Sequence, residues 1–170
     1  MISTPIMRRA MNPSSGIHPF RVKSAFAAVV VLVLASAHAW ATLGQSEATV
    51  TSDRLQLNSR EQVQTFDSYT VHQLTTDAGQ TVKEFVSPQG IVFGVSWQGR
   101  SVPYMTQLLG TYVNNLQTAT AAQKRILPRR GIAVTTNDFV YSNFCRMQMC
   151  SGQAYVVSIL PRNVSAGAIR

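Results

Sequence analysis

Two short turn sequences constrain the fold of this chain more than any other feature. They are Thr76-Asp77-Ala78-Gly79 and Ser87-Pro88-Gln89-Gly90. Each has the pattern of a type I turn followed by a glycine in the left-handed region, and Pro88 supplies the fixed φ of the second turn. The runs around them are Tyr69 to Thr75, Thr81 to Val86 and Ile91 to Trp97, all rich in β-branched and aromatic residues. The sequence therefore predicts a three-stranded antiparallel meander.

The two turns also predict the register of the meander. Thr76 faces Gln80 across the first turn and Ser87 faces Ile91 across the second, and strand alternation then assigns every side chain to a face. One face is a core surface made of Val71, Phe85 and Phe93, with Tyr69, Ile91, Val95 and Trp97 around them. The other face carries His72, Glu84 and Gly94 in one row and is only partly apolar.

The period of the apolar residues changes after Pro103. An amphipathic stripe follows at spacings of i, i+3, i+4, i+7 and i+11, formed by Met105, Leu108, Leu109, Tyr112 and Leu116. Ser101 suits the N-cap and Pro103 the first turn, while Gly110 inside the stripe costs about 1 kcal/mol against alanine. We expect one helix here, and we expect it to cover the aromatic face of the meander.

Elements at both ends complete the expected fold. Ser46 suits the N-cap of a short helix from Glu47 to Leu57. Two further strands, about Asp138 to Phe144 and Gln153 to Leu160, form a C-terminal hairpin. The predicted class is α+β, with an antiparallel sheet of a three-stranded meander plus this hairpin, packed by one amphipathic helix.

Residues 1–41 have the order of a secretory signal peptide. A basic leader precedes an uncharged run from Ser24 to Ala37, and small residues follow. The basic residues are Arg8, Arg9, Arg21 and Lys23. The run has about 14 residues, fewer than the roughly 18 of a membrane span, which disfavours an uncleaved anchor. Cleavage sites after Ala39 and Ala41 compete, and the second is preferred because Trp40 then leaves with the leader. We expect a periplasmic or secreted protein with one domain, residues 42–170, and no membrane span after cleavage.

Removal of the leader lowers the formal charge from +8 to +4, because 11 basic and all seven acidic residues remain. From Arg100 to Arg170 there are eight basic residues, and Asp138 is the only acid. This excess of basic residues indicates an anionic partner. The alternative is that the basic residues form a solvated face without a specific ligand. The residues expected to bind an anion are Lys124, Arg125, Arg129 and Arg130. Nucleic acid is not expected outside the cytoplasm, so the expected partner is an anionic envelope component or another exported protein.

Two cysteines, Cys145 and Cys150, lie close together in a chain expected to enter an oxidising compartment. A disulfide between them is the first interpretation. The rival interpretation is a Cu(I) site, because two thiolates and two thioethers are soft ligands. Its ligands would be Cys145, Met147, Met149 and Cys150.

His72 is the only histidine that remains after cleavage, so any histidine-based acid/base chemistry depends on it. The predicted register places Glu84 directly opposite, which allows a catalytic pair or an ordinary cross-strand pair. No nucleophile elbow, metal-ligand spacing or cofactor fingerprint accompanies the pair, so no cofactor is expected. The other acidic residues between Thr42 and Gly99 are expected to be surface charges: Glu47, Asp53, Glu61, Asp67 and Asp77.

Several short motifs resemble a known protein family. They are Ala39-Trp40-Ala41-Thr42-Leu43-Gly44, Tyr69-Thr70-Val71-His72, Glu84-Phe85-Val86-Ser87-Pro88, Val92-Phe93, Trp97-Gln98-Gly99, Leu108-Leu109-Gly110 and Ser151-Gly152-Gln153-Ala154-Tyr155-Val156. In this order and spacing they resemble a proteobacterial family of exported proteins known only as a domain of unknown function. The resemblance implies a signal peptide, a small periplasmic or secreted domain, and no established activity. The family pattern has a shorter turn without cysteines before Ser151, so the segment from Cys145 to Cys150 departs from it.

These observations favour a non-enzymatic envelope or secreted accessory domain that binds another envelope component. The first alternative is a hydrolase-type enzyme centred on His72 and Glu84. The weaker alternative is a periplasmic copper-binding protein that uses the cysteine turn.

Overall fold

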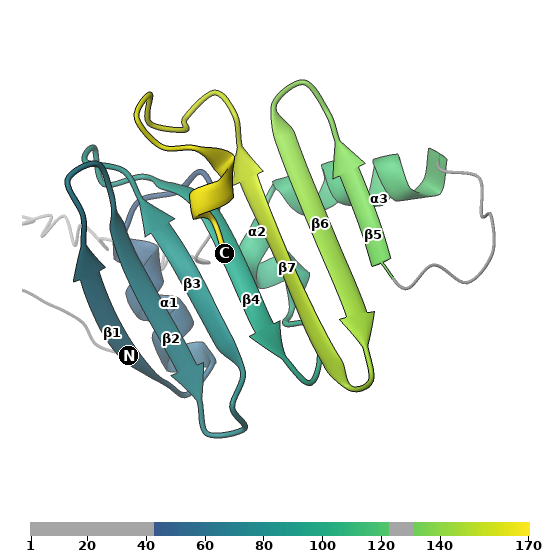
Figure 1. Ribbon diagram of the computed structural model, residues 1–170, viewed down its shortest axis with the longest axis horizontal. Coiled ribbons are helices and arrows are strands. Elements are labelled where there is room, and N and C mark those ends of the chain that lie inside the picture. The colour runs from purple at the N-terminus through teal and green to yellow at the C-terminus, as the bar shows by residue number, and fades with distance from the viewer. Residues whose placement is uncertain (1–42, 123–130) are drawn as a thin grey trace, which may run out of the picture. The chain divides into compact units, whose positions relative to one another are not determined.

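The computed structural model describes residues 43–122 and 131–170. They form a seven-stranded antiparallel sheet in the order β1-β2-β3-β4-β7-β6-β5 (Figure 1). The strands are β1 Ser59–Thr65, β2 Thr70–Thr76, β3 Thr81–Val86, β4 Val92–Gly99, β5 Gly131–Thr135, β6 Phe139–Arg146 and β7 Met149–Val156. The helices are α1 Ala48–Gln56, α2 Met105–Leu109, α3 Tyr112–Ala122 and the 3-10 helix η1 Ala166–Ala168. The mixed α+β class is confirmed, and the sheet is larger than the sequence predicted.

The predicted meander is formed by β2, β3 and β4. Both turns have the expected form: Gly79 and Gly90 have φ angles of 77° and 74°, in the left-handed region that favours glycine. The backbone N–H of Thr76 donates to the carbonyl of Gln80 at 2.9 Å, which closes the first turn. The register that follows from it, with Val71 opposite Phe85 and His72 opposite Glu84, is confirmed.

The register of β4 differs from the prediction because of a β-bulge. Val86 pairs with Val92 as expected, but Phe85 pairs with Gly94, so β4 has an extra residue at this point. A bulge shifts every later side chain of its strand to the other face. Val95 and Trp97 therefore belong to the core cluster of Leu74 and Val82, not to the aromatic face where they were expected.

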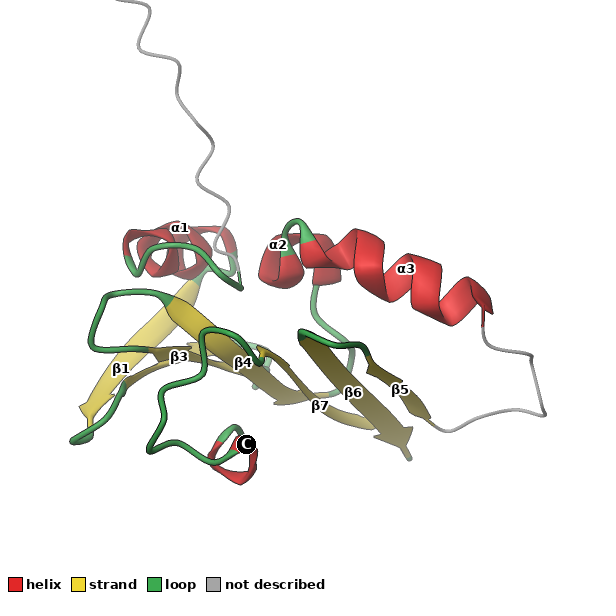
Figure 2. Cartoon of the chain, turned by 90° about the horizontal axis from the view of Figure 1, so that it is seen from above, coloured by secondary structure: helices red, strands yellow, loops and turns green. Residues whose placement is uncertain are grey.

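Three helices cover one face of the sheet, as seen from above in Figure 2. The predicted single helix is two helices, because Gly110 has φ 49° and ψ −120° and ends α2. Its apolar stripe is retained: Leu108, Leu109 and Leu116 are buried. The stripe packs with Val82, Val95 and Trp97, so the expectation that it covers the aromatic face is wrong.

The aromatic face is covered instead by the C-terminal segment, residues 157–170, which Figure 2 shows on the side of the sheet opposite the helices. Val164 and Ile169 pack there against Val71, Phe85 and Phe93. Gly94 makes this possible, because a Cβ atom at its position would lie 3.0 Å from Cδ1 of Ile169. The segment thus replaces the helix that the sequence placed on this face.

Two strands that the sequence did not predict form the sheet edges. β1 is exposed along nearly its whole length, and β5 has one buried residue, Val134. The C-terminal hairpin of β6 and β7 joins the meander by pairing β7 with β4, so one sheet results. Among the described residues, no helix is long and apolar enough to cross a membrane.

Candidate functional site

The sheet face that α1 covers carries a buried cluster of ionisable side chains. His72 on β2 is buried, and both nitrogens of its ring contact carboxylates. Its Nδ1 lies 2.7 Å from Oε1 of Glu61, and its Nε2 lies 3.0 Å from Oε1 of Glu47. Each ring nitrogen donates to the carboxylate that it faces when that nitrogen carries a proton. His72 therefore ties the start of α1 to the edge strand β1.

Glu84 on β3 forms the second part of the cluster and is only 1% exposed. Burial raises the pKa of Glu84 well above its ordinary 4.5, and the charge of Asp53, a hydrogen bond to the Asp53 side chain and the charge of Glu61 raise it further. As a carboxylate, Glu84 would find no donor for either oxygen. As an acid it can donate its proton to Asp53, so the two form a carboxyl–carboxylate pair.

Asp53 connects this pair to α2. Its side chain is fully buried, and its Oδ1 accepts a 2.6 Å hydrogen bond from Nε2 of Gln107. The expectation of a surface charge at Asp53 is therefore wrong. The signal that would have corrected it is the spacing of Val50, Asp53 and Leu57 at i, i+3 and i+7, which puts Asp53 on the apolar stripe of α1.

The cluster is closed to solvent at its centre. Its inner members are buried: Asp53, Glu84 and Gln107. The ring of His72 hydrogen-bonds to neighbouring carboxylates other than Glu84, so the predicted pair shares a register position without a direct hydrogen bond. In residues 43–122 and 131–170, no group of three or more His, Cys, Asp or Glu side chains is placed to hold a metal ion. The arrangement suits a structural link between α1, α2 and the sheet.

The hairpin of β6 and β7 carries the predicted disulfide. Cys145 and Cys150 are bonded and occupy paired positions at the end of the hairpin. Closing so short a loop is worth about 2 kcal/mol if the loss of unfolded-chain entropy is the main effect. Met147 and Met149 are exposed at the tip. The copper hypothesis requires two free thiols, so it concerns the reduced protein and stays a prediction.

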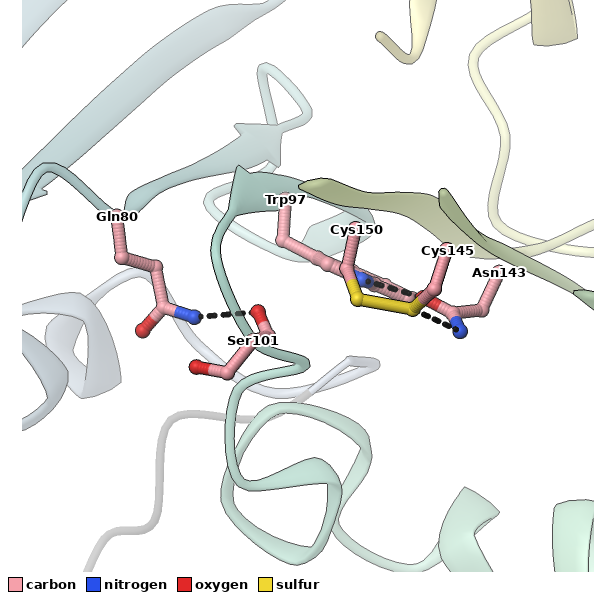
Figure 3. The surroundings of a disulfide bond; sticks show 6 residues. All are labelled: Gln80, Trp97, Ser101, Asn143, Cys145 and Cys150. Carbon is pink, nitrogen blue, oxygen red and sulfur yellow. Dashed lines mark hydrogen bonds between the residues drawn. A yellow bond between two sulfur atoms is a disulfide. The ribbon is translucent and has the colours of Figure 1, made fainter. Parts of the chain in front are cut away.

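Trp97 crosses a neighbouring strand beside the disulfide (Figure 3). Its Nε1 donates to Oδ1 of Asn143 at 3.1 Å, and Nδ2 of Asn143 lies 3.7 Å from Sγ of Cys145. Gly152 on β7 pairs with both Trp97 and Asn143 and so lies between them. A Cβ atom on Gly152 would lie 2.6 Å from Cε2 of Trp97, so glycine alone leaves room for the indole. These contacts hold β4, β7 and β6 together.

An open groove of about 700 Å³ lies on the other face of the sheet, the face away from the helices. Two rows of paired residues cross five strands, from β3 through β4, β7 and β6 to β5. The first row is Lys83, Ser96, Gln153, Ser142 and Ala133. The second row is Thr81, Gln98, Ser151, Phe144 and Gly131. All ten residues line the groove, and we call them the groove rows.

The C-terminal segment contributes a second cation to the groove. Nζ of Lys83 donates to the backbone carbonyl of Arg170 at 3.0 Å, and Nε of Arg170 donates to the carbonyl of Gly167 at 2.6 Å. Lys83 and Arg170 are the charged residues of the lining, and none of the described lining residues is acidic. The sign of charge in the groove therefore matches an anionic ligand.

The basic residues that the sequence singled out cannot be placed in this site. Lys124, Arg125, Arg129 and Arg130 lie outside the described residues, and their role in anion binding stays a prediction. Sequence reasoning missed the groove itself, because its floor depends on the pairing of β4 with β7. No turn connects these two strands, so no local pattern predicts their register.

Comparison with known proteins supports the family resemblance but assigns no activity. A family model described as "Protein of unknown function (DUF2844)" matches residues 39–169. No curated protein matches the chain, and no solved structure does.

Proposed function

Because the chain belongs to DUF2844, a family of proteins of unknown function, we propose its function from its geometry. It is a non-enzymatic accessory domain of the cell envelope or the secreted fraction, and it binds an anionic envelope component in the groove. One observation carries this proposal: the groove rows offer polar and cationic side chains on the sheet, and none of the described residues that line the groove has an acidic side chain.

The histidine cluster supports a binding domain over a hydrolase. A general base must reach the proton that it abstracts, but Glu84 is sealed between the sheet and Asp53. His72 is engaged by two carboxylates. The groove, by contrast, is open and crosses five strands. Binding at the groove is therefore the function that the side chains favour.

Export is the second part of the proposal. The order of basic leader, apolar run and small residues supports removal of residues 1–41, and the disulfide suits an oxidising compartment. We expect the intact mass of the protein, collected from the exported fraction without reductant, to begin at Thr42 and to be lighter than the reduced chain by two hydrogens. A mass that begins at Met1 would contradict processing, and bound copper with two free thiols would favour the copper alternative.

Groove binding is tested by adding one negative charge to the groove floor. Gln153→Glu keeps the size of the side chain and places a carboxylate in the middle of the first groove row. Gln117→Glu makes the same change on the exposed surface of α3 and is the matched control. We expect the first variant to bind poly-glutamate or oligogalacturonate about tenfold more weakly than the parent, a loss of ~1.4 kcal/mol, and the control to bind like the parent.

The measurement is a titration at fixed salt, followed by amide NMR shifts of the exported protein. The proposal predicts that shifts gather on the groove rows for at least one of the two polyanions. It is contradicted if both variants bind equally, or if the shifts gather around His72 instead. His72→Gln provides a further check, because a hydrolase site would lose substrate affinity or turnover in it while groove binding would stay unchanged.

A further inference from the structure

The middle of the groove floor is a regular array of hydrogen-bonding side chains. Its members are Ser96, Gln98, Ser142, Ser151 and Gln153. They come from β4, β7 and β6, which are neighbours in the sheet. Among the described residues, none of these five side chains has a hydrogen-bond partner in the protein. Ser96 is 4% exposed, and the hydroxyl and amide groups of the other four are available to a ligand. Strands about 4.8 Å apart repeat such groups at a fixed spacing.

The two ends of the groove differ in chemistry. At the β3 end stand Lys83 and Arg170, whose positions are fixed by hydrogen bonds to the C-terminal segment. An ammonium and a guanidinium that line the same groove suit a carboxylate. At the β5 end Phe144 is 49% exposed, and its ring lies against Gly131, where a Cβ atom would be 3.2 Å from Cδ2 of the ring. The ring is thus held on the sheet with apolar surface toward solvent.

A ligand that fits both ends and the middle needs three properties. It must carry a negative charge, a series of hydroxyl groups and a flat apolar face for the ring of Phe144. A sugar ring presents hydroxyl groups at its edge and C–H groups on its face, and a uronic acid adds a carboxylate. An acidic peptide supplies the charge but neither the repeated hydroxyl groups nor the C–H face.

We infer that the groove binds an acidic oligosaccharide that lies across the strands, with a carboxylate at Lys83 and Arg170 and a sugar ring on Phe144. The five strands of the groove rows span about 19 Å, which accommodates a short chain of sugar rings rather than a single one. This inference rests on the proposed function and names the class of its ligand. It assigns Phe144 as the residue that distinguishes a glycan from other polyanions.

The test compares three probes on the exported protein at physiological salt: oligogalacturonate, poly-glutamate of similar charge, and a neutral cello-oligosaccharide. We expect oligogalacturonate to bind more tightly than both of the others.

Phe144→Ala should weaken the binding of oligogalacturonate about tenfold, because the variant lacks the apolar ring surface that the sugar covers. Phe66→Ala is the matched control, since Phe66 is 47% exposed and lies outside the groove. Phe144→Leu keeps apolar bulk without a ring and serves if the alanine variant does not fold.

The outcomes separate this inference from the proposed function. If poly-glutamate binds as well as oligogalacturonate and the Phe144 variants bind both like the parent, the glycan inference is overturned while anion binding in the groove stands. If the neutral sugar binds as tightly as the acidic one, the carboxylate part is overturned. If no probe shifts the amide NMR signals of the groove rows, both the inference and the proposed function are contradicted.

Discussion

A Gly152→Ala variant is expected to lose about 3 kcal/mol or more of its free energy of unfolding. The added Cβ atom would lie 2.5 Å from the backbone oxygen of Ser142 and would also overlap Cζ2 of Trp97. Inserting one methyl group into a packed site typically costs about 1–3 kcal/mol, and here one neighbour is backbone that cannot turn aside. The indole must leave Asn143 or the sheet must open between β7 and β6.

The measurement is the urea midpoint of the variant against the parent. Gly167→Ala is the control, because the nearest atom to its Cβ position is 3.5 Å away, and a change within about 0.5 kcal/mol is expected there. A Gly152→Ala variant as stable as the parent would show that Trp97 does not cross β7 in the folded protein. A loss of groove binding in this variant at temperatures where it remains folded would show that the strand contact also shapes the groove.

The second large effect is a change in pH dependence when Glu84 is replaced by glutamine. In the unfolded chain Glu84 releases its proton near pH 4.5, whereas in the folded protein its pKa is raised well above that value. Between the two pKa values the folded state holds a proton that the unfolded state lacks, so a rise in pH favours unfolding by up to about 1.4 kcal/mol per unit. Glu84→Gln removes this loss of stability at higher pH, because the amide of glutamine does not ionise and still offers a donor to Asp53.

The test measures the free energy of unfolding at several pH values above 4.5. We expect the stability difference between Glu84→Gln and the parent to shift in favour of the variant as the pH rises. The other ionisable groups of the cluster are unchanged in both proteins: Glu47, Asp53, Arg54, Glu61 and His72. Asp77→Asn, at an exposed surface ion pair, should leave the slope of the parent unchanged. Parallel curves for Glu84→Gln and the parent would refute a proton held at Glu84.

The parts of the fold that the sequence predicted are those with local rules. The turns at Gly79 and Gly90 require left-handed backbone, and this requirement gave the pairing of His72 with Glu84 correctly. The β-bulge near Val92 has no such marker, because no turn residue at this point fixes the pairing of β3 with β4. Because of this bulge, the sequence assigned Val95 and Trp97 to the wrong face of the sheet.

The candidate sites were predictable to a smaller degree. The disulfide followed from the spacing of Cys145 and Cys150 and from the expected compartment. The edge strand β1 has no buried side, so its sequence shows no alternation of apolar and polar residues. The strand was therefore not predicted, and Glu61 on it was missed as a partner of His72. The groove rows depend on five strands in register, and that order is a property of the whole chain.

The order of strands also bears on how the chain folds. Every strand pair of the described sheet except one joins neighbours in the sequence, and the exception is β4 with β7. Val95 of β4 pairs with Ala154 of β7, and the whole segment that holds α2, α3, β5 and β6 lies between them in the sequence. Bringing such distant strands together costs more loop-closure entropy than closing a hairpin, so we expect this pairing to form later than the meander and the C-terminal hairpins. The floor of the groove spans the junction of these units, so we expect the groove to form late in folding.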